Sequence, residues 1–306
     1  MGEMSAAAVL PNEERLALPE WQYRRDQHLK RCEQVVDPLT RAARNDQPHP
    51  VYDFLFTYYR FRPQEHKRWS PGMGVRLQGA GVEVVPALNN FNQKGGCVSA
   101  ASYPEKRRRG LDWVISLMQA VASRPPLHSC SGLHEWAMVY QTEQPRHAVP
   151  LRFSRDELRD VVERQPLRCT HYDAFRFFTP AAAPRNRVQL TRENRCAHEQ
   201  PGCIHANMDL YKWAYKFYPW ISSERIMETF QLALRARILD MRASPYDLSQ
   251  WGFRPVKIET EAGRQEYDQA QRDLAQACQP VRQALLHELQ HLRKALTPSS
   301  GAGQTT

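Results

Sequence analysis

The last third of the chain constrains the fold most strongly, because its apolar residues recur every three or four positions. This spacing places apolar side chains along one face of a helix, which must then pack against another element. The pattern predicts three helices, over residues 204–218, 224–241 and 262–296. Ser222 or Ser223 suits the N-cap of the second helix, and Pro280 is expected to kink or split the third. We therefore predict a mainly α fold.

Helical patterning also extends through most of the remaining sequence. It predicts further helices over residues 12–44, 51–61, 106–124, 133–140 and 154–165. The last of these begins with a capping box, in which Ser154 is followed three residues later by Glu157. Residues 168–178 are compatible with a strand, so a few short strands accompany the helices.

No linker separates two self-sufficient cores, so we expect one multi-helix domain over residues 1–296. Glycines punctuate residues 70–105, which we interpret as a loop or hairpin inserted into that domain. The small polar residues 297–306 are typical of a disordered tail.

The composition excludes several classes of protein. No apolar stretch approaches the roughly 20 residues that a membrane-spanning helix needs. The first residues lack the basic and apolar regions of a secretory signal, and the seven cysteines are an odd number. These features favour free thiols in a reducing compartment, so we expect a cytoplasmic protein without membrane contact.

The net charge of +9 admits a polyanionic partner such as DNA, and 34 of the 42 basic residues are arginines. Arginine pairs bidentately with phosphate and stacks on flat rings. Lys106, Arg107, Arg108 and Arg109 precede a predicted helix, so we predict that they bind nucleic acid. The alternative is a solvated run of charges.

Residues 128–205 concentrate groups that bind metals or transfer protons. They contain six of the eleven histidines and four of the seven cysteines, including three Cys-x-His pairs that begin at Cys169, Cys196 and Cys203. Cysteine and histidine are the usual ligands of zinc, but Cys-x-His is not a usual chelating spacing. We therefore predict no cofactor and no metal site, with zinc as the alternative.

A polar stripe crosses the apolar surface of the predicted helix over 204–218. His205, Asp209, Lys212 and Lys216 follow one another at helical spacing, flanked by apolar side chains. A partly buried aspartate beside a lysine and a histidine is a setting that shifts pKa values, so His205, Asp209 and Lys212 are candidate catalytic residues. The alternative is an ion pair on a solvated edge.

Two further pairs are candidate acid–base groups. His171 and Asp173 would share one face of a strand over 168–178, where the carboxylate orients the imidazole. His134 and Glu135 precede Trp136, and a carboxyl group against an aromatic wall is a candidate general acid. A satisfied core histidine and an isolated glutamate are the respective alternatives.

Four segments together carry a resemblance to a known family. They are residues 49–59, 132–140, 171–178 and 198–213, with the sequences HPVYDFLFTYY, GLHEWAMVY, HYDAFRFF and HEQPGCIHANMDLYKW. They resemble a bacterial family commonly labelled 3-methyladenine DNA glycosylase, and the likeness extends over most of the chain from Pro19 to Leu286. The helix-hairpin-helix motif of many known glycosylases does not occur in the sequence.

The resemblance implies a DNA-repair enzyme that releases alkylated purines such as 3-methyladenine. Such an enzyme must extrude the damaged base and hold it by stacking on aromatic rings. Asp209 or Asp173 would stabilise the sugar cation or activate water, and the basic residues would hold the DNA backbone.

Two other functions remain open on the sequence alone. One is an enzyme of a small molecule or nucleotide that uses the His, Cys and Asp residues between 128 and 209, with or without a metal. The other is a nucleic-acid-binding protein without catalysis.

Overall fold

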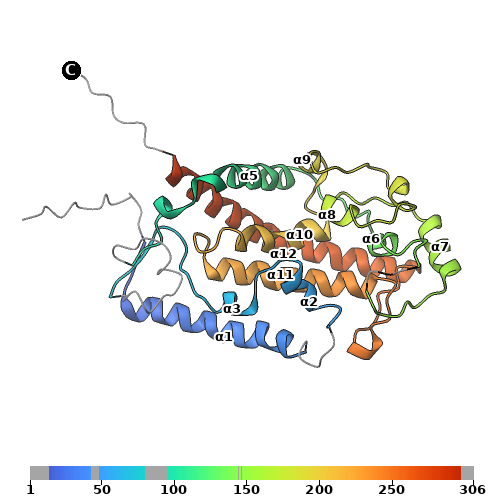
Figure 1. The fold of residues 1–306 in the computed structure, drawn as a ribbon, viewed down its shortest axis with the longest axis horizontal. Coiled ribbons are helices and arrows are strands. Elements are labelled where there is room, and N and C mark those ends of the chain that lie inside the picture. The colour runs from blue at the N-terminus through green and yellow to red at the C-terminus, as the bar shows by residue number, and fades with distance from the viewer. Residues whose placement is uncertain (1–13, 43–47, 80–95, 144, 146, 298–306) are drawn as a thin grey trace, which may run out of the picture.

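The computed structural model describes residues 14–42, 48–79, 96–143, 145 and 147–297 (Figure 1). Three of its longest helices confirm the prediction for the last third of the chain, and the fold is mainly α. They are α10 (Ile204–Tyr215), α11 (Ser223–Ala243) and α12 (Glu261–Leu296). These helices pack on one another in the centre of the molecule. The expected disordered tail falls outside the described residues, apart from Thr297.

The central helices begin at side-chain caps. The hydroxyl of Ser222 accepts a hydrogen bond from the amide of Arg225 at the start of α11, and Thr260 caps α12 in the same way. Pro280 does not split α12, contrary to one of the two expected outcomes. Its ring is exposed on the solvent side of the helix, where a missing backbone donor leaves no buried acceptor unpaired.

Two more long helices cover the central three from opposite sides (Figure 1). Helix α5 (Arg108–Ala122) packs on α12, and α1 (Leu18–Ala42) packs on α11. The predicted helix over 12–44 therefore starts later than expected. Residues Glu14–Leu16 instead form strand β1, which pairs in parallel with β2 (Val75–Leu77). The pairing joins segments far apart in sequence and buries Leu16 and Leu77.

The aromatic segment over 51–61 forms a shorter helix than predicted. Helix α2 covers Asp53–Thr57, and Arg60 then adopts a left-handed backbone conformation with φ of 56°. The proline at 63 begins helix α3 (Pro63–His66) rather than only ending α2, because proline suits the first position of a helix.

Short helices gather at one end of the central layer (Figure 1). They are α6 (Leu133–Ala137), α7 (Arg155–Arg164), α8 (Tyr172–Phe175) and α9 (Arg195–His198). Helix α7 confirms the predicted capping box of Ser154 and Glu157. The predicted strand over 168–178 is wrong, because the ring of His171 caps α8 by accepting a hydrogen bond from the amide of Ala174.

Single turns of 3₁₀-helix complete the described elements. They are η2 (Ala100–Ser102), η3 (Glu105–Arg107), η4 (Ala183–Arg185) and η5 (Ser249–Trp251).

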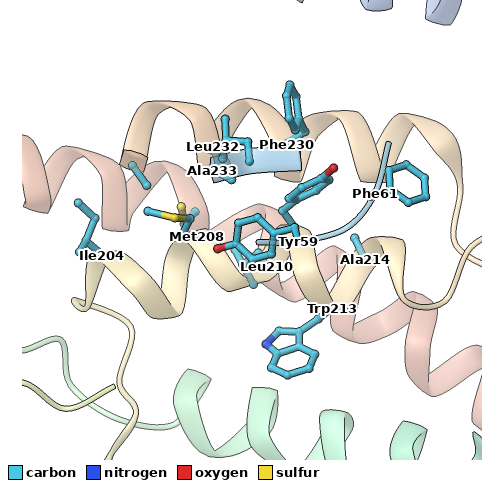
Figure 2. Packing of buried hydrophobic residues seen from close by; sticks show 14 of the residues in the cluster. Tyr59, Phe61, Ile204, Met208, Leu210, Trp213, Ala214, Phe230, Leu232 and Ala233 are labelled. Carbon is cyan, nitrogen blue, oxygen red and sulfur yellow. The ribbon is translucent and has the colours of Figure 1, made fainter. Parts of the chain in front are cut away.

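The core forms one hydrophobic cluster that draws on segments from Leu16 to Leu296. Figure 2 shows its centre, where Met208 points from α10 toward α11 and Trp213 points away from α11. Rings of Tyr59, Tyr211 and Phe230 meet edge to face at this centre, with centroids 5.2 Å apart in each neighbouring pair. Among the described residues, no helix combines the length and the apolar character that a membrane crossing requires.

Candidate functional site: two charge clusters on helix α10

The seven predicted catalytic residues converge around α10, where they join two neighbouring clusters of charged side chains. We call the first the Asp209 cluster: Asp209, Asp173, Lys212, Arg195, Glu199 and His171. We call the second the Asp240 cluster: Asp240, His134, Glu135, His205 and Arg237.

Lys212 joins the two aspartates of the Asp209 cluster. Its Nζ atom lies 2.6 Å from Asp173 and 3.0 Å from Asp209. The hydroxyl of Tyr59 donates a hydrogen bond of 3.3 Å to the other carboxylate oxygen of Asp209. Asp209 and Lys212 thus form the ion pair given as the alternative, but Asp209 is only 2% exposed, so the pair is buried and does not lie on a solvated edge.

Arg195 and His171 complete the Asp209 cluster. Arg195 donates a hydrogen bond of 2.8 Å to Glu199 and lies 3.3 Å from Asp173. The Nδ1 atom of His171 accepts from a backbone amide, so a neutral ring carries its proton on Nε2. That atom lies 3.4 Å from Asp209 and 3.7 Å from Glu199.

Neighbouring positive charge and a hydrogen-bond donor keep Asp209 ionised. Burial raises its pKa, but Lys212, His171 and Arg195 outweigh burial and hold the pKa well below its usual range. Burial lowers the pKa of Lys212, but the carboxylates of Asp209 and Asp173 outweigh burial and raise it. Burial likewise raises the pKa of Asp173, and Lys212 more than offsets this. At neutral pH these groups are therefore charged, and none is poised to exchange a proton.

The Asp240 cluster lies between α6, α10 and α11. His134 Nε2 is 2.5 Å from one carboxylate oxygen of Asp240, and His205 Nε2 is 3.7 Å from the other. Arg237 lies 3.2 Å from Asp240 and 3.6 Å from Glu135. Asp240 is 0% exposed, so the cluster is part of the protein interior.

The two histidines of this cluster respond to it in opposite ways. Burial lowers the pKa of His134, but Cys130 and Asp240 outweigh burial and raise it well above the usual value. Burial lowers the pKa of His205 to about 3, although Asp240 opposes this, and the nearby His134 lowers it further. His134 is therefore the charged partner of Asp240, and His205 stays neutral at pH 7.

A glycine sets the position of α6, which supplies His134 and Glu135. Gly132 precedes the helix with φ of 75°, a left-handed conformation that other residues rarely adopt. A Cβ atom here would lie 3.1 Å from Ala243 and 3.2 Å from Tyr267, so α6 sits close against α11 and α12. This approach carries His134 to Asp240.

The histidine rings connect the two clusters. The ring of His205 meets that of His134 edge to face at 4.6 Å and stacks on that of His171 at 5.5 Å. The polar stripe of α10 thus serves two sites, since His205 belongs to the Asp240 cluster and Asp209 and Lys212 to the other.

A solvent-filled pocket of about 710 Å³ opens between α5 and α10, and we call it the basic pocket. Its cationic lining residues are Lys106, Arg107, Arg109, Arg192, Arg195, Lys212 and Lys216. Trp113 and Trp213 also line it and meet edge to face at 5.6 Å. Lys212 and Arg195 belong to the pocket and to the Asp209 cluster, so the cluster lies directly behind the pocket wall.

The structure divides the predicted nucleic-acid-binding run. Lys106 and Arg109 are exposed at the basic pocket. Arg107 lines the pocket as well, but its guanidinium lies over the ring of Tyr103 and donates a hydrogen bond to the carbonyl of Lys216. Arg108 is not among the lining residues, and it pairs with Glu105 at 2.8 Å.

The cysteines do not form the zinc site that the Cys-x-His pairs offered as an alternative. All seven lie within the described residues and are free thiols. The one group of possible metal ligands found within the described ranges consists of His134, Glu135, His205 and Asp240. Cys130 lies beside this group, with its Sγ atom 3.1 Å from Nδ1 of His134.

Sequence reasoning missed several residues of the two clusters and of the basic pocket. Arg237 and Asp240 were assigned only to a helix, and Arg195, Glu199 and Trp113 were assigned no role. Arg237 and Asp240 fall on the apolar face of α11, among residues such as Ala233 and Ala236. Charged residues on the apolar face of a helix are a usable signal of a buried ion pair, because a charged side chain is buried only when a partner lies opposite it.

Comparisons with known proteins found no relative of this chain. No family model, no curated protein and no solved structure matches the chain.

Proposed function

We propose that the protein is an enzyme that binds DNA at the basic pocket and releases alkylated purines by hydrolysis of the N-glycosidic bond. The basic pocket supports the binding part of this proposal, and the resemblance to the glycosylase family supports the reaction. We also propose a cytoplasmic location, because none of the seven cysteines, all of which lie within the described residues, forms a disulfide.

The single observation that carries the proposal is the combination of cations and indole rings in one pocket. Lys106, Arg109 and Lys216 place positive charge where a sugar-phosphate backbone would lie. Trp113 is 38% exposed beside them, with the guanidinium of Arg195 over its ring at 5.4 Å, and we assign its exposed part to stacking with a base that has left the stack. A pocket of about 710 Å³ has room for a nucleotide.

Asp173 is the carboxylate we assign to the reaction. Its side chain is 13% exposed, whereas that of Asp209 is 2% exposed beneath Lys212. In the reaction, the bond between the sugar and the purine nitrogen breaks, and its electron pair leaves with the base. Water then adds to the sugar carbon and gives up a proton to solvent. Asp173 lies behind the pocket wall formed by Lys212 and Arg195, so its ionised carboxylate acts on the developing sugar cation through space, and Lys212 positions it.

A nucleotide or another small phosphorylated molecule is the second candidate substrate. One observation favours it: Lys212 and Arg195 stand between the basic pocket and the aspartates, so the pocket presents cations to its ligand. Such a pocket suits a phosphate group better than the cationic base of an alkylated purine.

The test of the reaction is release of free 3-methyladenine from methylated duplex DNA, measured by chromatography. We expect release by the wild type and by Asp273→Asn, a control that changes an exposed aspartate of α12. Asp173→Asn should lower the rate at least about 100-fold, the usual contribution of a positioned charged group. Circular dichroism of each variant shows whether it is folded.

Three other outcomes would redirect the proposal. Equal rates for Asp173→Asn and the wild type would remove Asp173 from the reaction. A folded wild type that binds DNA without releasing base would be a nucleic-acid-binding protein. Competition of nucleoside monophosphates for the pocket, without binding of DNA, would favour the second candidate.

A further inference from the structure

We propose that His134, His205, Asp240 and Glu135 bind one divalent first-row transition-metal ion, such as Zn²⁺. This site lies apart from the basic pocket, and the inference does not depend on the proposed glycosylase reaction. It rests on the geometry of the four side chains, on their burial, on the groups around them and on an adjoining cavity.

The geometry places one ligand atom from each of the four side chains within 4.8 Å of the others. Ligands at about 2.0–2.2 Å from a tetrahedral metal are about 3.3–3.6 Å from one another. The distance of 3.7 Å between His205 and Asp240 is close to that value. The contact of 2.5 Å between His134 and Asp240 must lengthen by about 1 Å, which a small rotation of either side chain supplies.

The chemistry of the four side chains suits a transition metal. Two imidazoles and two carboxylates form a mixed N and O set, which Zn²⁺ accepts, as do Fe²⁺ and Mn²⁺. The set comes from three helices, and three of its side chains are buried, with His134 1% and Glu135 5% exposed, whereas the side chain of His205 is 13% exposed. Acidic groups that gather only on a solvated surface do not have this character. A doubly charged ion here would offset the charges of both carboxylates and would replace the proton that His134 carries in the metal-free cluster.

Outer partners orient the ligands as they do around metals in proteins. Cys130 Sγ lies 3.1 Å from Nδ1 of His134, so the other nitrogen of that ring is directed toward Asp240. Arg237 contacts both carboxylates, at 3.2 Å from Asp240 and 3.6 Å from Glu135. These contacts fix ring and carboxylate orientation before any ion binds.

A small cavity adjoins the two histidines. Its volume is about 10 Å³, and its lining includes His134, His205, Cys130 and Cys203. This is about the space that one water molecule needs. A metal bound by the four side chains therefore has room for one water as a further ligand on the histidine side. A metal-bound water is the feature that distinguishes catalytic from purely structural zinc sites.

The test is direct measurement of bound metal in the full chain. Protein freed of metal with a chelator is dialysed against Zn²⁺ or Mn²⁺ at low micromolar concentration, and bound metal is measured by mass spectrometry. We expect about one equivalent of metal in the wild type. His205→Gln and Glu135→Gln should bind less than about one tenth of that amount. His287→Gln, which changes an exposed histidine of α12, is the matched control and should bind as the wild type does.

A second readout separates loss of the site from loss of the fold. Zn²⁺ should raise the Tm of the wild type and of His287→Gln, and leave the Tm of His205→Gln unchanged. If the wild type binds less than about one tenth of an equivalent of either ion, the proposal is wrong. Equal binding by wild type, His205→Gln and Glu135→Gln would also overturn it, because the ion would then sit elsewhere. Binding of DNA by the basic pocket is unaffected in each of these outcomes.

Discussion

The two ends of helix α10 make a direct comparison between a closed and an open site. Near the N-terminal end, His205 faces Asp240 in a cluster that is almost wholly buried. Near the C-terminal end, Lys212 and Lys216 line the basic pocket. Asp209 lies between these ends and forms an ion pair with Lys212, which lines the open site. One polar stripe on one helix thus serves an interior cluster and a solvent-filled pocket.

The difference arises from what packs opposite each end. Helices α6 and α11 supply charged partners to His205, so its polar ring can be buried. Helix α5 instead offers Trp113 and the basic residues before it, which leave space for a ligand. A helical stripe of polar residues therefore indicates that partners exist. It does not indicate whether they are protein groups or ligand groups.

The largest expected effect tests the closed end. Asp240→Asn removes a carboxylate that pairs with His134 and Arg237, both almost fully buried. We expect the free energy of unfolding at pH 7 to fall by about 3–5 kcal/mol, because two buried cations lose their partner. Urea denaturation measures this, with Asp273→Asn as a control that stays within about 0.5 kcal/mol of the wild type. A loss below 1 kcal/mol would mean that solvent reaches the cluster.

The next effect tests the support behind the open end. Lys212→Met keeps the length of the side chain but leaves Asp209 and Asp173 with one cation fewer. We expect a loss of about 2–3 kcal/mol, less than at Asp240 because Arg195 remains. Adding Asp209→Asn to Lys212→Met should recover about 1–2 kcal/mol of the summed single losses. Strict additivity in this cycle would show that the two residues are not coupled.

A third prediction concerns a histidine of α3 that packs against α10. His66 accepts or donates a hydrogen bond of 2.8 Å with Tyr211 and packs on Phe61 and Phe230. Burial, and then the nearby His28, lower its pKa from 6.5 to about 3. Below pH 6.5 the unfolded chain takes up a proton at this residue and the folded chain does not, so stability falls as the pH falls.

The size of this effect follows from the difference in pKa. Between pH 6.5 and pH 5, His66 should account for about 1.6 kcal/mol of lost stability. His66→Gln should remove that part of the pH dependence, whereas His287→Gln should keep it. Urea denaturation at both pH values makes the comparison. An unchanged pH dependence in His66→Gln would contradict a neutral buried His66.

The smallest of these effects tests the aromatic wall of the open end. Trp113→Ala removes one indole of the basic pocket without removing a charge. We expect about tenfold weaker binding of a single-stranded oligonucleotide, since stacking of one base contributes about 1–3 kcal/mol. The dependence of affinity on salt should stay as in the wild type, because the number of phosphate contacts is unchanged. Fluorescence anisotropy measures both quantities. Unchanged affinity would exclude stacking on Trp113.

Much of the fold was predictable because helical periodicity and caps are local signals. The capping box at Ser154 and the serine cap of α11 lie where the sequence places them. The strand expected over 168–178 failed because the side chain of His171 bonds to the backbone of α8, a local contact that alternation of residues does not reveal. The parallel pairing of β1 with β2 joins distant segments, and no local pattern specifies it.

Many residues of the candidate site could be identified one by one from the sequence, but their arrangement in space could not. The sequence identified His205 as part of a polar stripe among apolar side chains and His134 as the neighbour of Glu135 and Trp136. The shared partner, Asp240, lies 106 residues from His134 in the chain, and its role depends on how α6 packs on α11. Spacing along one helix also grouped His205 with Lys212, which the packing of α5 and α11 assigns to different sites.

The basic pocket as the binding site for nucleic acid is the central claim, and the salt dependence of DNA affinity tests it most directly. Anisotropy of a labelled oligonucleotide is measured at several salt concentrations for three proteins. They are the wild type, Lys106→Ala with Arg109→Ala, and Arg155→Ala with Arg159→Ala as an exposed basic pair of α7. We expect the pocket variant to lower the slope of log affinity against log salt by about 1–2, and the control variant to retain the wild-type slope. Equal slopes for all three proteins would show that DNA does not bind in the basic pocket.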